Sequence, residues 1–308
     1  MVDFTTVAAA LEAALHPGAV KVSAPLRDLT TFRIGGAAAV LVEPSCSHEV
    51  AQAVRICAEH AAPWRVLGLG SDLLISDEGV AGVVIRLAEN LSGVLVEGSR
   101  VRVEAGASNA DVARAAREAG LAGYEFASGI PGTIGGAAIM NAGAYGGEFR
   151  DVCARLTCLT PAGDIVHVTA WEACWGYRHS MMSDRGYVVL EAELVLRPDD
   201  ARAIQARMDD LQVRREEKQP LEMPSAGSTF KRPRGYFAGK LIQDAGLRGF
   251  RVGGAQVSEK HTGFVVNAGG ATAADVRALI AEVQRRVFDS FGVHLEPEVR
   301  MWGFPDSD

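Results

Sequence analysis

Apolar residues recur along the chain with two periods, one typical of helices and one typical of strands. Spacings of three and four residues predict helices, which lie at 1–19, 47–60, 109–120, 199–217, 241–247 and 273–291. Short apolar runs predict strands between them, at 38–43, 64–67, 83–87, 94–96, 101–104, 155–160, 164–169, 187–196, 265–267 and 295–302. The stretch 127–147 is rich in glycine and predicts loop or turn.

The clearest helix signal covers 273–291. Thr272 and Asp275 have the spacing of a capping box, and Gly292 predicts the helix end. Ser47 is expected to cap the helix that runs to His60. The apolar stripe of the 273–291 helix consists of Val276, Leu279, Ile280, Val283, Val287 and Phe291.

Composition narrows the class of protein. The 308 residues are 48% hydrophobic and 22% charged, which is ordinary for a globular protein that can bury a core. The net charge of −7 argues against a nucleic-acid partner. No apolar run reaches the roughly 18 residues of a membrane span. The first residues carry no basic segment, so we expect no signal peptide and a cytoplasmic protein.

The cysteines and histidines do not form a metal-binding pattern. Five cysteines, an odd number, include no Cys-x-x-Cys pair, and the seven histidines include no His-x-x-x-His. We therefore expect no metal site, and we expect the five thiols to be small buried hydrophobes in a reducing cytosol.

Glycines gather in two candidate phosphate-binding loops. The first, 68–74, follows a predicted strand, and its Gly-Leu-Gly-Ser sequence fits either a structural turn or an anion site. Leu73 occupies the third glycine position of the dinucleotide fingerprint, so that fingerprint is absent. The second loop has four glycines within 128–136 and is followed by Asn-Ala-Gly-Ala-Tyr-Gly at 141–146. Glycines so dense beside isoleucines favour a nucleotide or flavin site over a plain loop.

These loops, in this order, resemble the UDP-N-acetylenolpyruvoylglucosamine reductase (MurB) family, and the resemblance covers about residues 20–302. The matching segments are 31–36, 67–76, 106–108, 129–146, 177–180, 227–231, 238–242, 258–264 and 295–300. The resemblance implies an α+β fold, in which a two-part FAD-binding domain of the p-cresol methylhydroxylase and vanillyl-alcohol oxidase type is joined to a smaller α+β substrate-binding domain. We place these parts at 1–82, 83–212 and 213–303. The region between Ser180 and Gln219 has no room for the tyrosine-bearing lid of the family's longer variant.

The resemblance also implies a reaction. NADPH gives a hydride to non-covalently bound FAD, and the flavin passes it to the β-carbon of the enolpyruvyl ether of UDP-N-acetylglucosamine, a step in peptidoglycan precursor synthesis. Arg178 matches the residue that holds the substrate carboxylate, Ser228 matches the proton donor, and Glu298 matches the acid that polarises the carboxylate. Glu296, two residues earlier on the same predicted strand face, competes with Glu298 for that role.

The remaining predicted site residues follow from the glycine loops and the matching segments. The cofactor-binding residues are Arg33, Gly35, Gly68, Gly70, Ser71, Asp72, Gly129, Pro131, Gly132, Thr133, Gly135, Gly136, Asn141, Gly143 and Tyr145. The residues expected to bind the UDP-sugar are Tyr177, Lys218, Lys231 and Lys240.

Two other functions remain open on the sequence. One is an FAD-dependent oxidase of the same fold, but the histidine that many such oxidases link to FAD is replaced by Ala37. The other is a flavin-binding module without turnover. We expect no nucleic-acid or membrane partner, and we favour a monomer.

Overall fold

The computed structural model describes residues 2–305, and the chain divides into two compact units. Unit 1 comprises the chain up to Val22, Val40–Leu69 and Gly82–Arg215. Unit 2 comprises Ser23–Ala39, Gly70–Ala81 and the chain from Glu216 onward. The chain therefore passes between the units several times. The three-part division predicted from the sequence stays a prediction.

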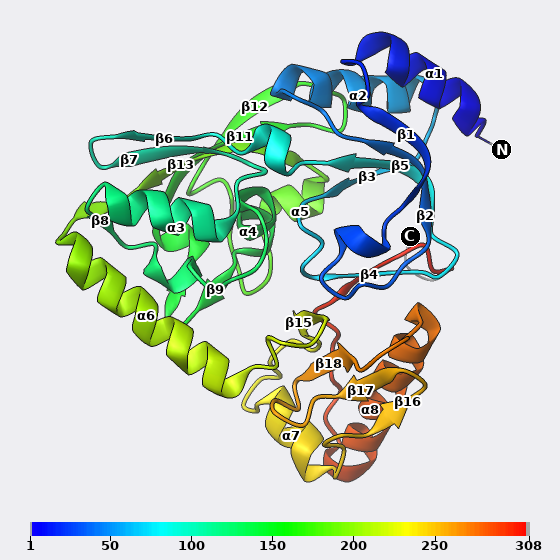
Figure 1. The fold of residues 1–308 in the computed structure, drawn as a ribbon, viewed down its shortest axis with the longest axis vertical. Helices are drawn as coiled ribbons and strands as arrows, with labels where there is room; N and C mark the ends of the chain where they lie inside the picture. Colours follow the sequence, from blue (N-terminus) through cyan, green and yellow to red (C-terminus); the bar gives the residue numbers. More distant parts are fainter. Residues whose placement is uncertain (1, 306–308) are drawn as a thin grey trace. The chain divides into compact units, whose positions relative to one another are not determined.

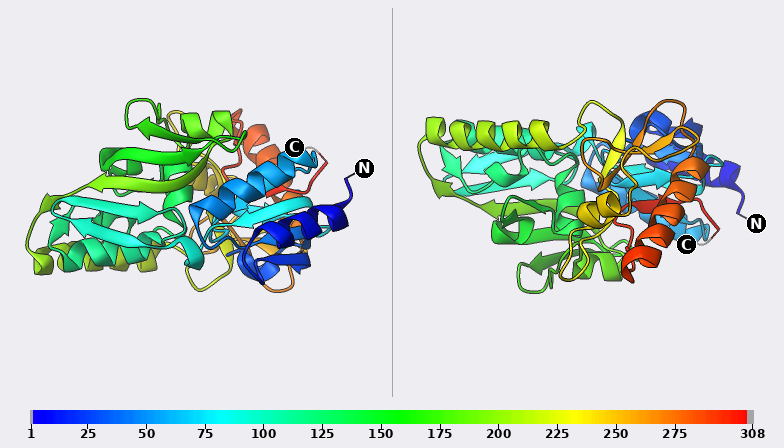
Figure 2. Two further views of the ribbon diagram at one scale, coloured as in Figure 1. Left: turned by 90° about the horizontal axis from the view of Figure 1, so that it is seen from above. Right: turned by 90° about the horizontal axis from the view of Figure 1, so that it is seen from below.

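Most of a four-stranded sheet, with the strand order β1-β2-β5-β3, belongs to unit 1. Its strands are β1 (Val20–Pro25), β2 (Ala37–Val42), β5 (Val80–Arg86) and β3 (Trp64–Leu67), and β3 is parallel to β5. Helices α1 (Phe4–Ala14) and α2 (Ser47–Glu59) pack against each other (Figures 1 and 2). The Glu49 carboxylate joins their ends, because it accepts hydrogen bonds from the His16 and Ser45 backbone N–H groups at 2.8 and 2.7 Å.

A five-stranded antiparallel sheet forms the rest of the unit 1 framework, in the order β12-β11-β13-β7-β6. Its strands are β12 (Ile165–Thr169), β11 (Cys153–Leu159), β13 (Val188–Val195), β7 (Arg100–Glu104) and β6 (Val94–Glu97). Helices α3 (Asn109–Glu118) and α4 (Ile134–Met140) contact this sheet, as Figure 1 shows. Helix α6 (Ala201–Lys218) follows β13.

Unit 2 has its own antiparallel sheet, in the order β15-β18-β17-β16. Its strands are β15 (Ser225–Ser228), β18 (Phe264–Asn267), β17 (Ala255–Val257) and β16 (Arg251–Val252). Helix α8 (Ala273–Phe291) packs on β16, β17 and α7 (Ala238–Asp244). Strand β19 (Arg300–Trp302) pairs in parallel with β4 (Leu73–Ile75).

Short elements connect these parts. They are the pair β8 (Leu121–Ala122) and β14 (Arg197–Pro198), the hairpin β9 (Gly143–Ala144) and β10 (Gly147–Glu148), helix α5 (Met181–Arg185), and the 3-10 turns η1 (Arg27–Leu29), η2 (Glu89–Leu91), η3 (Glu125–Ala127) and η4 (Phe149–Asp151). Among residues 2–305, no helix combines the length and hydropathy that crossing a membrane requires.

The prediction of loop throughout 127–147 is wrong. Thr133 caps helix α4, and the hairpin β9–β10 follows it. The low helix propensity of Gly135 is overridden by packing: a Cβ there would lie 3.1 Å from the Ala105 Cβ, a tight contact that favours glycine.

The 295–302 strand prediction is also wrong in its first half. Pro297 has no N–H for a ladder and forms only an isolated bridge to Phe230, so β19 begins at Arg300. For helix α8, the predicted capping box of Thr272 and Asp275 and the predicted helix end at Gly292 are confirmed.

Three smaller expectations need correction. The α2 N-cap is Cys46 rather than Ser47, which is the first helical residue. Cys57, Cys153 and Cys158 are buried as expected, but Cys46 and Cys174 are exposed. Phe291, the last residue of the predicted α8 stripe, is 41% exposed because the helix extends beyond its core at that end.

Candidate functional site

The two predicted glycine loops meet inside unit 1. A Cβ added at Gly68 would lie 2.6 Å from the Thr133 side-chain oxygen, so the first loop passes directly over the N-cap of α4. Such close approach requires glycine and explains Gly68 without a ligand. It also brings two segments together that are more than sixty residues apart in the printed sequence.

Several backbone donors of the second loop already have protein partners. The N–H groups of Ile130, Ile134 and Gly135 donate to the carbonyls of Ala127, Ala107 and Ala105, each at 2.9 Å. A bound diphosphate cannot use these three donors without breaking those bonds. The Gly136 N–H also has a partner, the Thr133 side-chain oxygen at 3.4 Å, but Gly136 is exposed and the nearest atom to an added Cβ is 3.7 Å away. The protein leaves open space at Gly136, which fits a bound group.

Packing explains several predicted cofactor glycines. A Cβ added at Gly70 would lie 2.3 Å from the Leu29 carbonyl oxygen. One added at Gly35 would lie 2.8 Å from the Ile75 Cβ, and one added at Gly143 would lie 2.7 Å from the Gly147 carbonyl oxygen. These glycines are required by neighbouring protein atoms. A role in binding FAD would come in addition to that requirement.

Other predicted cofactor residues lie near these glycines. In unit 2, Arg33 is exposed and has a left-handed φ of 54°. The carbonyl of Asp72, the residue after Ser71, accepts a hydrogen bond from the Arg300 N–H at 3.0 Å. In unit 1, Pro131 is exposed and Gly132 has a φ of 124°.

Arg178 lies in a tight turn, Gly176–His179, which we call the Arg178 turn. The Gly176 N–H donates to the His179 carbonyl at 3.0 Å, and Arg178 has a φ of 54°. A positive φ at the third turn position is typical of type II turns and normally selects glycine. The Arg178 guanidinium carbon lies 5.0 Å from the centroid of the half-exposed Tyr177 ring. A side chain in this strained conformation indicates a functional constraint.

Tyr145 is held in a similar conformation. It and Gly146 form the two-residue connection of the β9–β10 hairpin, with φ values of 52° and 88°. Two positive φ angles are typical of a type I′ turn, which prefers Asn or Gly at the first position. An exposed tyrosine there is unfavourable for the backbone, which favours a role for its side chain.

Ser228 follows a bulge at the end of β15. The pairing of β15 with β18 shifts register between Ser225 and Ser228, and Gly227 within this shift has a φ of 73°. Bulges of this kind redirect the next side chain. Ser228 is exposed, while its neighbour Thr229 is buried and accepts a hydrogen bond from the Val265 N–H at 2.9 Å.

Glu298 lies on the segment that pairs with the residues after Ser228. The Glu298 N–H donates to the Thr229 carbonyl at 2.8 Å, and the Lys231 N–H donates to the Glu296 carbonyl at 2.8 Å. We call this arrangement, residues 225–231 with 296–298, the Ser228 corner. The structure therefore brings Ser228 and Glu298 together within unit 2. The two glutamates differ: Glu298 is half-buried, whereas Glu296 is exposed and paired with Lys231.

Comparisons with known proteins cover most of the chain. Residues 219–302 match the family described as UDP-N-acetylenolpyruvoylglucosamine reductase, C-terminal domain, and residues 38–169 match the FAD binding domain. A UDP-N-acetylenolpyruvoylglucosamine reductase of Clostridium perfringens is 49% identical over 284 residues, which are 92% of this chain and 93% of the relative. The chain belongs to this reductase family.

Other members of the reductase family agree with this assignment. A reductase of Agathobacter rectalis is 50% identical over 291 residues, 91% of this chain and 92% of its own. The crystal structure of the reductase (MurB) from Thermus caldophilus has a TM-score of 0.79 at 36% identity, covering 92% of this chain and 98% of that one. The predicted family and the α+β fold with an FAD-binding domain are confirmed. Membership favours a reductase over an oxidase or a binding module without turnover.

Two of the three lysines predicted to bind substrate in this reductase-family chain have carboxylate neighbours. Lys231 pairs with Glu296, and Lys240 pairs with Asp244 one helical turn away. Lys218 is exposed at the end of α6. A substrate diphosphate that binds Lys231 or Lys240 would have to compete with these carboxylates.

The sequence analysis missed Arg215, a residue of α6 that is only 9% exposed. Its guanidinium donates to the Gly129 carbonyl in the second glycine loop and bonds to Tyr145. Its Nε is buried without a hydrogen-bond partner among residues 2–305, and burial lowers the pKa of the group. The signal was present: Arg215 continues the apolar stripe of Ile204, Met208 and Leu211. An arginine at such a position predicts a buried polar contact.

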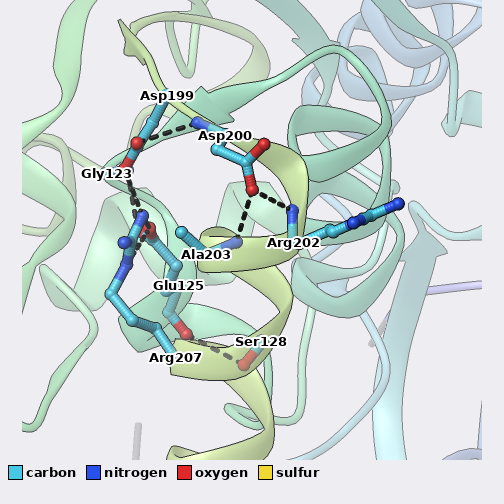
Figure 3. A network of polar contacts seen from close by, with 8 residues as sticks. All are labelled: Gly123, Glu125, Ser128, Asp199, Asp200, Arg202, Ala203 and Arg207. Atoms are coloured by element: carbon cyan, nitrogen blue, oxygen red, sulfur yellow. Dashed lines mark hydrogen bonds and ion pairs between the residues drawn. The ribbon is translucent and has the colours of Figure 1, made fainter.

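A polar network holds the other end of α6 (Figure 3). Arg207 donates to the Glu125 carboxylate at 2.9 and 2.7 Å and to Asp199 at 2.6 Å, and the Ser128 hydroxyl donates to the Glu125 carbonyl at 2.8 Å. Burial acts to raise the pKa of Glu125, but hydrogen bonds from backbone N–H groups and Arg207 keep it below its usual value. The network thus fixes α6 beside the start of the second glycine loop.

Proposed function

We propose that this protein reduces the enolpyruvyl ether of UDP-N-acetylglucosamine to its lactyl ether, UDP-N-acetylmuramate, with NADPH as hydride donor and FAD bound non-covalently. Family membership supports the reaction class. The observation that supports the assignment of roles is the Ser228 corner, where backbone hydrogen bonds pair the segment after Ser228 with the segment that carries the half-buried Glu298.

The residues of unit 1 fit a flavin site. The open space at Gly136 and the buried unpartnered Nε of Arg215 beside Gly129 suit a cofactor with hydrogen-bond acceptors. Gly132 and Thr133 lie in the same loop, between Gly129 and Gly136. Bound FAD supplies the hydride that the reaction adds to carbon. Ala37, which follows Gly35-Gly36, offers no side chain for a covalent link.

Arg178 holds the substrate carboxylate in this proposal. A guanidinium offers two parallel donors that match the two carboxylate oxygens. Hydride addition to the β-carbon moves electron density onto the α-carbon and into the carboxylate. A fixed cation stabilises that negative charge as it develops. Such electrostatic stabilisation of the transition state is usually the largest single contribution to catalysis. The strained φ of Arg178 indicates that its direction is set by the fold.

Ser228 delivers the proton to the α-carbon. Its hydroxyl is a weak acid, but the enolate carbon that forms is a strong base, so transfer needs only contact and alignment. The bulge at Gly227 sets that alignment. Because Ser228 is exposed, water can return a proton to its oxygen after turnover.

Glu298 supports the same carboxylate. A protonated carboxyl donates a hydrogen bond to the enolate-like carboxylate, whereas an ionised one would repel it. Glu298 is half-buried, where solvent competes less with a hydrogen bond to the substrate carboxylate, whereas Glu296 is exposed and paired with Lys231. We therefore assign this role to Glu298.

The UDP part of the substrate is assigned to Tyr177, Lys218, Lys231 and Lys240. The proposal includes a cytoplasmic enzyme, because its substrate and NADPH are both soluble metabolites, and a monomer.

An anaerobic flavin assay tests the function. The purified protein should be yellow, should release its flavin on acid precipitation, and should bleach with NADPH. Addition of the enolpyruvyl ether should restore the colour without oxygen, whereas UDP-N-acetylglucosamine should not. A reduced flavin that only oxygen reoxidises would contradict the proposal.

A further inference from the structure

Asn141 is a buried residue at the end of helix α4. It is 1% exposed and caps α4 in the left-handed conformation, with φ 44° and ψ 56°. Asparagine tolerates this conformation better than most residues. The cap alone therefore explains the backbone of Asn141, and its side chain needs a separate explanation.

The Asn141 side chain uses its donors and its acceptor within the protein. Its Nδ2 donates to the Gly176 carbonyl at 3.1 Å and to the Glu148 carboxylate at 2.9 Å. Its Oδ1 accepts from the Arg150 N–H at 3.0 Å. The chemistry of the partners fixes the amide orientation, since two are acceptors and one is a donor. Both Nδ2 hydrogens are used, so the side chain has no donor left for FAD.

Gly176 is the first residue of the Arg178 turn, which is attached to the end of α4 by three side chains. Besides Asn141, the Trp175 Nε1 donates to the Ala138 carbonyl at 2.8 Å, and the Ser180 hydroxyl donates to the Ile139 carbonyl at 2.8 Å. Trp175 and Ser180 flank the turn, and both donate to carbonyls in the last turn of α4. Asn141 is the one of the three that binds the turn itself.

We propose that Asn141 is a positioning residue for Arg178: it holds the Gly176–His179 turn so that the guanidinium is presented in one direction. The inference rests on the proposed role of Arg178 and deepens it. Arg178 has an unfavourable φ, which persists only where the surrounding structure enforces it. Without the bond to Gly176, the turn can relax and Arg178 can leave the position from which it binds a carboxylate.

The isosteric variant Asn141→Asp is the sharpest test. Aspartate keeps the size and the tolerance of the left-handed conformation, but it cannot donate to Gly176 and places a second carboxylate beside Glu148. The purified holoenzyme should keep its flavin and its rate of reduction by NADPH. Reoxidation by the enolpyruvyl ether should slow between about tenfold and a hundredfold, as for a misplaced catalytic group.

A double-mutant cycle shows whether Asn141 acts through Arg178. In an Arg178→Ala background, Asn141→Asp should change reoxidation little, because the group it positions is already gone. Equal loss with and without Arg178 would overturn the inference, and so would loss of flavin or an equally slow reductive step. Glu49→Gln is the matched control: it is also an isosteric change of a buried hydrogen-bonding side chain in unit 1, and it should leave both half-reactions unchanged.

Hydrogen exchange separates this inference from the proposed function. Amides of the Arg178 turn should exchange faster in Asn141→Asp than in the wild-type holoenzyme, and the Glu49→Gln control should match wild type there. Unchanged protection of the turn would refute the positioning role whatever the enzyme catalyses. A wild-type flavin that the ether does not reoxidise would refute the proposed function, while faster exchange would still support the role of Asn141 in holding the turn.

Discussion

The Ser228 corner and the Arg178 turn position their side chains in different ways. In the corner, backbone hydrogen bonds between 229–231 and 296–298 set the register, and a bulge at Gly227 aims Ser228. In the turn, side chains of Trp175, Ser180 and Asn141 fasten a strained loop to a helix end.

The difference predicts where each region is vulnerable. A backbone ladder depends little on its exposed side chains, so substitutions at exposed positions of the corner should matter mainly where they remove a reacting group. The turn depends on the buried side chains of Ser180 and Asn141 and on the half-buried Trp175. Remote substitutions around it should therefore reduce activity as well as stability.

The largest effect is expected for Ser228→Ala. Reoxidation of the reduced enzyme by the enolpyruvyl ether should slow by at least about 10²-fold, the lower end for loss of a general acid. Reduction by NADPH should be unaffected, because it needs no proton on carbon. Stopped-flow measurement of each half-reaction checks this, and equal loss in both would show that Ser228 is structural.

Glu298→Gln is expected to have the next largest effect, slowing reoxidation by about tenfold or more, since a neutral amide keeps a donor but cannot act as a protonated acid. Glu296→Gln should have little effect, because Glu296 is exposed and bound to Lys231. The same reoxidation assay compares the two. A larger loss for Glu296→Gln would move the role by two residues.

Trp175→Phe tests the vulnerability of the Arg178 turn. It keeps an aromatic ring near Phe149 but removes the donor to the Ala138 carbonyl. The free energy of unfolding should fall by about 1 kcal/mol, as for one lost hydrogen bond. Reoxidation should slow by a few-fold while reduction by NADPH does not. Stability loss without any change in reoxidation would show that this anchor does not reach Arg178.

Glu49→Gln should have the smallest effect on activity and a clear effect on stability. Burial acts to raise the pKa of Glu49, but bonds from Ser45 and His16 outweigh it and hold the pKa at about 2, below the ordinary 4.5. A lowered folded-state pKa stabilises the fold above pH 4.5, and the contribution is lost as the pH falls toward 2.

At neutral pH we expect the free energy of unfolding of Glu49→Gln to be lower by about 1–3 kcal/mol. The difference from wild type should shrink between pH 4.5 and 2 in denaturant titrations. A difference that does not depend on pH would show that the charge of Glu49 contributes nothing.

Much of the fold could be predicted because local signals and packing agree. The α8 helix has a capping box, an apolar stripe and a terminal glycine, and all three are seen. Helix α4 could not be predicted, because its glycines oppose helix formation and only packing on Ala105 and the strands explains them. The prediction for 295–302 is wrong at the start of the segment because Pro297 interrupts it.

The site could be predicted at the level of segments but not of contacts. The glycine loops and the Ser228 and Glu298 segments were found from motifs. Packing requires glycine at Gly70 because the Leu29 carbonyl oxygen, distant in sequence, lies next to it. The same holds for Asn141, whose partner Gly176 lies 35 positions later in the chain, and for Arg215, which only its place on an apolar stripe marks.

Single-turnover product analysis tests the central claim most directly. Holoenzyme reduced with one equivalent of NADPH is mixed anaerobically with one equivalent of the enolpyruvyl ether, and the mass of the product is measured by mass spectrometry. The account predicts one lactyl ether per flavin, heavier than the substrate by two hydrogens, together with return of the yellow colour. Recovery of unchanged ether, with the flavin still reduced until air is admitted, would contradict it.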